Sequence, residues 1–375
     1  MSEPNPTDPV LSTNSPIPTD AAVLGGEAGK QQRLRSPKYR NYRFCHRFSH
    51  PVRPRFISPD NRYFYEIDYP GFDIRRIDIQ TGKCVYTFPR VHRPGSCSRL
   101  IFDIALSHDG CLLAMAHDEL TATLWRVDQN SENPLLYLDA RNLDANYMNY
   151  DIPPSLLKRV AFTANDEYLF ALASSNKWKD VHTAMWKLQP PHRYPTRDIP
   201  RPLEDCMEMM AVSADGSVFV GKKPDSSIEV VKFVCSSKIK RKKRELKRKQ
   251  ISRVFPDNSN ILGLAVSPDN QWFAAVSENS LRLGHVETLD LREPISVAQI
   301  DRLVFTPDSR TLISSGKDGW VQFWDIPSGD QCGSLPRYED PVSALVSSRD
   351  GTILLIYSKP KDQPMGWINV WELAE

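Results

Sequence analysis

Several features of secreted and membrane proteins are missing from this 375-residue sequence. It has no run of about 18 apolar residues, so we expect no segment to span a bilayer. Its N-terminus has neither a basic start nor an apolar core, so we expect no signal peptide. The seven cysteines are odd in number and never spaced Cys-x-x-Cys, and no Asn-x-Ser/Thr sequon occurs without proline. These absences predict an intracellular protein with free thiols.

Recognisable catalytic and metal-binding patterns are absent too. Neither Gly-x-Ser-x-Gly nor His-Glu-x-x-His occurs. The pair Ser174 and Lys177 falls in a connection between expected strands rather than at the start of a helix. Cys45, His46 and His50 cluster, but no second ligand pair follows at zinc spacing. We therefore predict no catalytic residue, no metal ligand and no cofactor.

Charge is nearly balanced overall but very uneven along the chain. The formal net charge is +2, from 48 basic and 46 acidic residues. Residues 238–249 hold nine Lys/Arg and one Glu, a local charge of +8, and residues 1–40 hold +1, which leaves about −7 on the rest. Residues 1–40 are also rich in Pro, Ser, Thr, Asn and Gly. They predict a disordered N-terminal tail, with order beginning near Tyr42.

A turn motif repeats along the rest of the chain. An apolar run, a small polar residue and an Asp/Asn turn recur seven times, from FISPDN at 56–61 to VSSRDG at 346–351, with steps of 39 to 56 residues. Pro, Asp and Gly or Asn in this order favour a tight turn with a left-handed residue. Because a second apolar run follows each turn, each copy predicts a β-hairpin.

A second signal follows each turn by 16 to 21 residues. An apolar strand ends there in Trp in four copies, at Trp125, Trp186, Trp324 and Trp371. A fourth short strand follows in several copies, such as KCVYTF at 83–88. Four short strands in each of seven units, without helical periodicity, predict an all-β fold, a single β-propeller of seven four-stranded blades over residues 41–375. The Trp residues are expected to pack between blades.

These residues resemble the WD-repeat propeller family. Trp324-Asp325 within GKDGWVQFWDIPSGDQCGSL, at 316–335, is a nearly complete family signature. The Gly-His pair that precedes the first strand of each family repeat is missing, so the family's His–Ser–Trp–Asp tetrad is incomplete here. The family habit of closing the ring with an N-terminal strand implies that Tyr42–Phe48 supplies the strand missing after Trp371.

Two segments are candidates for binding. In the family's topology, the connections 139–158 and 174–181 share one face, and their Tyr147, Met148, Tyr150 and Trp178 predict a partner-binding rim; the alternative is that these rings fold back as structure. The basic run predicts an import signal or a polyanion contact, with an edge strand protected by lysine as the alternative. Its basic residues are Lys238, Lys240, Arg241, Lys242, Lys243, Arg244, Lys247, Arg248 and Lys249.

The function expected from this fold is that of a non-catalytic protein-interaction scaffold that displays loops on a rigid ring. We expect the partners to be other proteins, with an import receptor or a polyanion at residues 238–249, and we expect no membrane contact. By itself the protein is expected to be a monomer, located in the nucleus rather than the cytoplasm. One alternative is a nucleic-acid- or chromatin-associated propeller that uses the basic run. A second is an enzyme with acid and base residues at the central channel.

Overall fold

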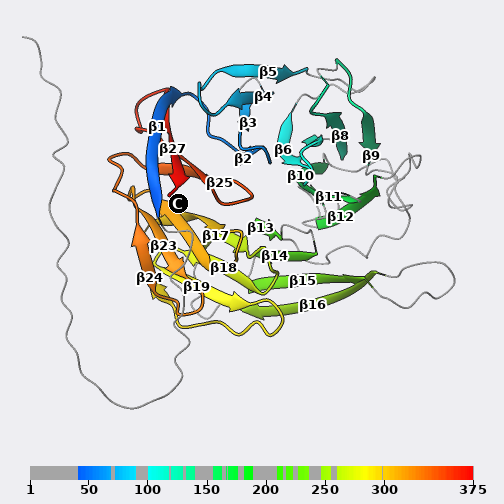
Figure 1. Ribbon diagram of the computed structural model, residues 1–375. Helices are drawn as coiled ribbons and strands as arrows, with labels where there is room; N and C mark the ends of the chain where they lie inside the picture. The colour runs from blue at the N-terminus through cyan, green and yellow to red at the C-terminus, as the bar shows by residue number, and fades with distance from the viewer. Residues whose placement is uncertain are drawn as a thin grey trace, which may run out of the picture. The chain divides into compact units, whose positions relative to one another are not determined.

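The computed structural model describes residues 41–374 except 69–71, 90–99, 118–119, 130–131, 140–154, 163–165, 167, 176–180, 189–208, 214–216, 223–226, 236–245, 255–259 and 298. Every regular element in these residues is a β-strand. The strands form seven antiparallel sheets around a ring (Figure 1), six with four strands and one with three. The predicted all-β propeller is confirmed. The predicted tail, residues 1–40, lies outside the described residues.

Each sheet is one blade, and in blades 1 to 6 the strands run in chain order from the inside of the ring outward. Blade 1 has β2 (Phe56–Ile57), β3 (Tyr63–Asp68), β4 (Asp73–Asp78) and β5 (Cys84–Phe88). Blade 2 has β6 (Ile101–Leu106), β7 (Leu112–His117), β8 (Thr121–Arg126) and β9 (Leu136–Asp139). Blade 3 has β10 (Ser155–Phe162), β11 (Tyr168–Ser175) and β12 (Val181–Lys187). Residues 189–208, where its predicted fourth strand would fall, lie outside the described part.

The remaining blades follow the same order. Blade 4 has β13 (Met209–Val212), β14 (Val218–Lys222), β15 (Ser227–Cys235) and β16 (Leu246–Val254). Blade 5 has β17 (Ile261–Val266), β18 (Trp272–Ser277), β19 (Ser280–His285) and β20 (Ile295–Ser296). Blade 6 has β21 (Ile300–Phe305), β22 (Thr311–Gly316), β23 (Val321–Asp325) and β24 (Gln331–Ser334). Blade 7 has β25 (Val342–Ser347), β26 (Ile353–Ser358) and β27 (Gly366–Leu373), and it is completed by β1 (Tyr42–His50).

The last blade takes its outer strand from the start of the described chain. β1 pairs antiparallel with β27 from Tyr42↔Leu373 to His50↔Gly366, with one register shift near Phe44. The predicted closure by Tyr42–Phe48 is therefore confirmed. Because β1 covers the edge that β27 would otherwise expose, both ends of the propeller are held in one sheet.

The hydrophobic core lies between blades rather than inside any one blade. Buried side chains of blades 1 and 2 form one cluster, for example, and those of blades 7 and 1 form another. The Trp residues that end the third strands belong to these layers: Trp125, Trp186, Trp324 and Trp371 are all buried. Their predicted core role is confirmed. Trp324 Nε1 donates to Ser314 Oγ at 2.8 Å, which is the Ser–Trp part of the family tetrad.

The repeated turn motif explains why blades 1, 2, 4, 5, 6 and 7 begin with the same hairpin; residues 163–165 and 167, in the turn of blade 3, lie outside the described residues. In blade 2, Leu112 N donates to Ser107 Oγ at 2.8 Å, while Ser107 Oγ donates to Asp109 Oδ1 at 2.6 Å. Asp109 Oδ1 also accepts from Cys111 N, at 2.8 Å. Gly110 then takes the left-handed conformation, with φ 74°. The equivalent hydroxyl receives the same backbone bond at Ser58, Ser213, Ser267, Thr306 and Ser348.

Candidate functional site

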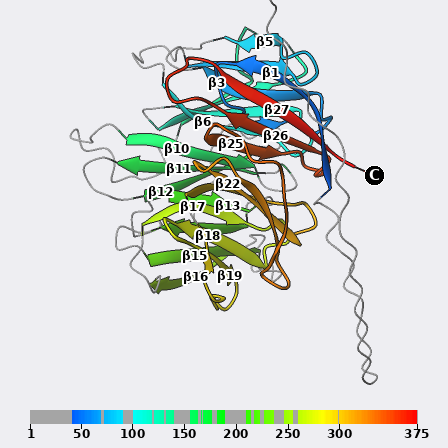
Figure 2. The ribbon, with the colours of Figure 1, turned by 90° about the vertical axis from the view of Figure 1, so that its left-hand side faces the viewer.

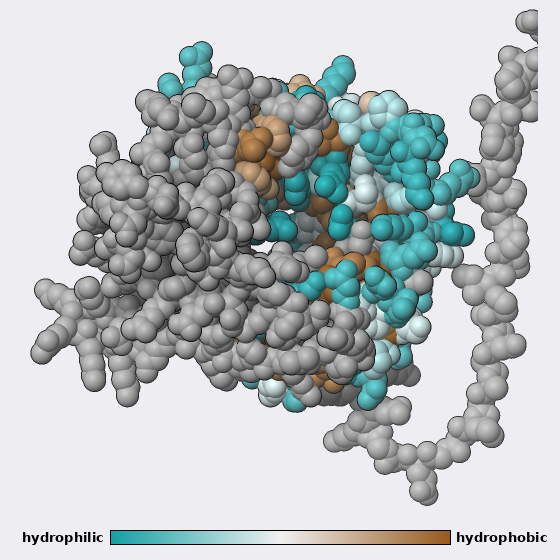
Figure 3. All heavy atoms as spheres, turned by 180° about the vertical axis from the view of Figure 1, so that it is seen from behind, coloured by the Kyte–Doolittle hydropathy of each residue, from teal (hydrophilic) through white to brown (hydrophobic). Residues whose placement is uncertain are grey.

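Two faces of the ring follow from the order of strands in each blade. The turns that join first to second strands and third to fourth strands lie on one face, called here the turn face. The links between blades and those joining second to third strands lie on the other, the connection face. Figure 2 shows the sheets edge-on, with the end of β27 pointing right, so the turn face is on the right. Figure 3 views the molecule from the connection-face side and shows brown apolar residues among teal ones around a central hollow.

The predicted partner-binding rim falls outside the described residues. Tyr147, Met148, Tyr150 and Trp178 lie in the segments 140–154 and 176–180. That prediction stays open.

The basic run is described only in its second half. β16 is the outer strand of blade 4 and contains Lys247, Arg248 and Lys249, which pair with Val234, Phe233 and Lys232 of β15. The other basic positions, Lys238 to Arg244, lie outside the described residues. Residues 246–249 therefore lie in the outer strand of blade 4.

Other large apolar side chains are exposed on the connection face, and sequence reasoning missed them. Trp320, in the link between β22 and β23, is 39% exposed, and Met365, before β27, is 38% exposed. Leu100, before β6, is exposed on the same face. The sequence held one signal: Trp320 follows a Lys-Asp-Gly turn rather than ending a strand, so it falls outside the pattern of the buried Trp residues.

The turn that carries Trp320 is fixed by hydrogen bonds from the next interblade link. Trp320 N donates to Asp318 Oδ1 at 3.1 Å, and Arg337 Nε donates to Asp318 O at 2.9 Å. Tyr338 N donates to Gly319 O at 2.9 Å. Gly319 has a φ of 79°, and a Cβ there would collide with Tyr338 O. The local sequence therefore presents the Trp320 ring on a turn that does not need to be ordered when a partner binds.

Met365 sits on a link that is held from below by Tyr357. Gly366 packs directly against the Tyr357 ring, where no Cβ would fit. Tyr357 Oη donates to Pro51 O at 3.1 Å, which joins this link to residues 51–55. Burial, followed by the charge of Glu66, raises the pKa of Tyr357. Lys359 N donates to Pro341 O at 3.2 Å, so the links of blades 6, 7 and 1 form one continuous surface.

A row of ionisable side chains lies beneath this surface, at the seam of blades 7 and 1. His50 Nε2 is 2.5 Å from Glu66 Oε2, and both side chains are buried. Arg75 Nη1 is 3.7 Å from Glu66 Oε1, and Arg75 also pairs with Asp68. The carboxylates of this seam are thus engaged by cationic or imidazole groups of the same seam. The contact between His50 and Glu66 joins β1, the strand that closes the ring, to blade 1.

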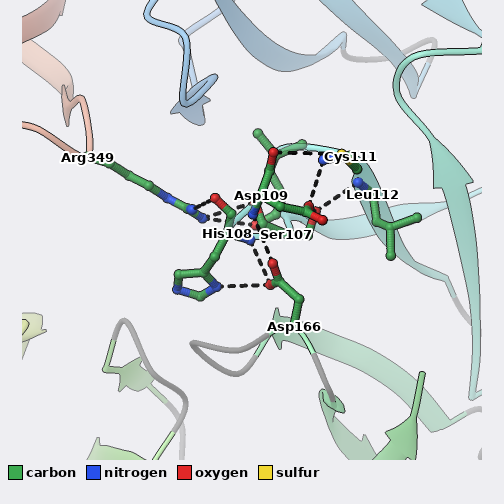
Figure 4. A network of polar contacts seen from close by, with 8 residues as sticks. Ser107, His108, Asp109, Cys111, Leu112, Asp166 and Arg349 are labelled. Atoms are coloured by element: carbon green, nitrogen blue, oxygen red, sulfur yellow. Dashed lines mark hydrogen bonds and ion pairs between the residues drawn. The ribbon is translucent and has the colours of Figure 1, made fainter. Parts of the chain in front are cut away.

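The turn face, by contrast, uses its polar side chains to hold turns together (Figure 4). Arg349 reaches from blade 7 past blade 1 and donates to Ser107 O at 3.1 Å and to His108 O. Asp166 accepts from His108 N at 2.7 Å and from Asp109 N at 2.9 Å. Burial alone would raise the pKa of Asp109, but hydrogen bonds from Ser107 and Cys111 outweigh it and lower that pKa. These groups bond to backbone atoms of neighbouring turns, which fits a structural role.

The described residues contain neither a group of metal ligands nor a membrane-spanning helix. Among the described residues, no three His, Cys, Asp or Glu side chains are grouped so that they could hold a metal ion. The same residues contain no helix long and apolar enough to cross a membrane.

Comparison with known proteins identifies the repeat. A family model described as "WD domain, G-beta repeat" matches residues 249–283 and 293–325. The chain is a divergent WD-repeat β-propeller. Each matched stretch begins at the outer strand of one blade and continues through inner strands of the next, so the sequence repeat of this WD-repeat propeller spans two blades. Because each repeat supplies the outer strand of the preceding blade, the outer strand of blade 7 comes from β1, which precedes blade 1 in the sequence.

One relative supports the family without indicating a partner. An uncharacterised WD repeat-containing protein of Synechocystis sp. is 30% identical to this propeller over 98 residues, which is 25% of this chain and 28% of that protein. The match therefore covers little more than a quarter of the relative's length. WD-repeat propellers generally bind other proteins and are generally not enzymes.

Proposed function

We propose that this WD-repeat propeller is a non-catalytic interaction scaffold that binds a partner protein on its connection face over blades 6 and 7. The observation that carries the proposal is the exposure of Trp320 and Met365 on links whose backbones are already fixed. Large apolar side chains on a rigid surface are typical anchors of protein interfaces. Because little of this chain must be ordered on binding, more of the contact energy remains as affinity.

The test is quantitative affinity purification with mass spectrometry. The wild type is compared with Trp320→Ala/Met365→Ala and with Tyr137→Ala, a control that removes a more exposed ring from the outer strand β9. We expect the double variant to lose specific partners by about tenfold or more, because anchor truncations cost about 2 kcal/mol. The control should keep them. Equal recovery with both variants, both folded by circular dichroism, would refute the proposal.

The basic run supports a second function, delivery to the nucleus or contact with a polyanion. Nine basic residues in residues 238–249 exceed what protection of an edge strand needs, and the described part of the run lies on an outer strand. Neutralising Lys240, Arg241, Lys242, Lys243 and Arg244 to Gln in a fluorescent fusion should move it from nucleus to cytoplasm. An unchanged distribution, or a wild-type fusion that is never nuclear, would reject nuclear delivery. Salt-dependent retention on heparin, lost in the same variant, tests the polyanion contact.

A further inference from the structure

The seam between blades 7 and 1 carries a concentration of positive charge beside the proposed binding surface. Two links form its outer layer, residues 51–55 and 359–365. They contain four basic residues, Arg53, Arg55, Lys359 and Lys361, against one acidic residue, Asp362. The adjoining link, residues 336–341, holds Arg337, Glu339 and Asp340, a net charge of −1. The chain outside residues 1–40 and 238–249 carries about −7, so the positive excess on the two links runs against the charge of the propeller around it.

Apolar groups lie within this basic surface. Met365 is exposed, and Trp367, at the start of β27, is partly exposed. The Arg47 guanidinium stacks over the Trp367 ring at 4.7 Å from its centroid. Such a stack covers part of the ring and adds a fifth positive charge to the seam.

The two links are held together, so their charges act as one surface. Tyr357 contacts Gly366 at the end of one link and donates to Pro51 O at the start of the other. Arg53 follows Pro51 by two positions, so it belongs to the link that Tyr357 holds. The acidic groups beneath, Glu66 and Asp68, lie against His50 and Arg75.

We infer that the partner segment bound on this face is acidic, with apolar side chains set among carboxylates. The inference rests on the proposed scaffold function and adds the chemistry of the partner. Met365 and Trp367 would contact the apolar side chains, while Lys359 and Lys361 would meet the carboxylates. Complementary charge around an apolar centre raises the association rate and excludes basic segments.

The experiment measures fluorescence anisotropy with two short fluorescein-labelled peptides. In one, leucines alternate with glutamates, and in the other each glutamate is replaced by glutamine. The protein carries glutamines at Lys240, Arg241, Lys242, Lys243 and Arg244, which lowers the charge of the basic run from +8 to +3 and so weakens its capture of the acidic peptide. We expect the acidic peptide to bind about tenfold more tightly than the neutral one, and the difference to shrink as salt is raised.

A matched pair of charge reversals locates the site. Lys361→Glu changes the seam, and Lys83→Glu makes the same change at an exposed lysine on the turn face. We expect Lys361→Glu to weaken the acidic peptide by about tenfold and Lys83→Glu to leave it unchanged. Equal binding of the two peptides, or equal effects of the two variants, would overturn the inference. If cellular partners still depend on Trp320 and Met365 in that case, the scaffold function stands and only the acidic chemistry is wrong.

Discussion

A partly buried histidine predicts how this propeller loses stability in acid. His117 ends β7 in blade 2, and its Nε2 lies 2.8 Å from Thr123 Oγ1, which in turn accepts from Trp125 Nε1 at 3.1 Å. Burial lowers the pKa of His117 to about 4, from an ordinary value of 6.5. The folded protein therefore keeps the ring neutral at pH values where the unfolded chain protonates it.

The sign and size follow from proton linkage. Above pH 6.5 both states hold a neutral ring, so this residue does not change stability with pH. Between pH 6.5 and about 4 the unfolded state binds the extra proton, and the free energy of unfolding falls by about 1.4 kcal/mol per pH unit, about 3 kcal/mol in all. Asp109 and Asp350, whose pKa values are lowered by their turn hydrogen bonds, add a loss only at lower pH, below about 3.8.

The assay is urea unfolding followed by tryptophan fluorescence at pH 7.5, 6.5, 5.5 and 4.5. We compare the wild type with His117→Gln, which keeps a polar neutral group beside Thr123. His46→Gln, a change at a histidine of the closing strand, is the control. We expect the wild type and the control to lose stability below pH 6.5 and His117→Gln to lose markedly less. If His117→Gln follows the wild type over this range, the buried neutral histidine is not the cause.

Three further predictions test other parts of the molecule. Deleting residues 1–40 should leave the melting temperature unchanged. Deleting residues 1–50 also removes β1, and it should lower the free energy of unfolding by several kcal/mol or make the protein insoluble. Equal melting temperatures of the two truncated proteins would contradict closure by this strand. Ser348→Ala removes the hydroxyl that accepts a hydrogen bond from Ile353 N, and it should lower the free energy of unfolding in urea by about 1–3 kcal/mol. The control Ser328→Ala, at an exposed turn, should lower it much less. Similar losses for the two variants would argue against a stabilising role of the turn motif. Tyr147→Ala, Tyr150→Ala and Trp178→Ala should each weaken partner capture with the fold intact, and unfolding would assign these rings to structure.

The sequence predicts what depends on local chemistry. Pro, Asp and Gly or Asn after a small hydroxyl residue predict the turns, and Asn61, Gly110, Asn270 and Gly351 are indeed left-handed. The count of strands left after Trp371 predicts closure by β1. The turns depend on residues a few positions apart, and the closure follows from counting strands along the sequence.

Contacts between blades could not be predicted in this way. Arg349 bonds to a turn about 240 positions earlier in the chain, and no local pattern distinguishes it from a solvated arginine. Trp320 and Trp324 are four positions apart, yet one is exposed and the other buried, because one lies in a link and the other at the end of a strand. Where such side chains meet depends on the register and tilt of whole blades, which periodicity alone does not contain.

The two faces of the ring differ in what their hydrogen bonds leave for a partner. On the described turn face, side chains such as Arg349 and Asp166 bond to the backbone of neighbouring turns, so binding a partner through them would first break those bonds. On the connection face, backbone atoms and side chains such as Tyr357 and Arg337 hold the links, and Trp320, Met365 and Lys361 remain exposed. A partner can therefore bury apolar surface there without disturbing the bonds that order it. The rigidity of the ring and the exposure of Trp320 and Met365 thus favour the connection face for the proposed binding.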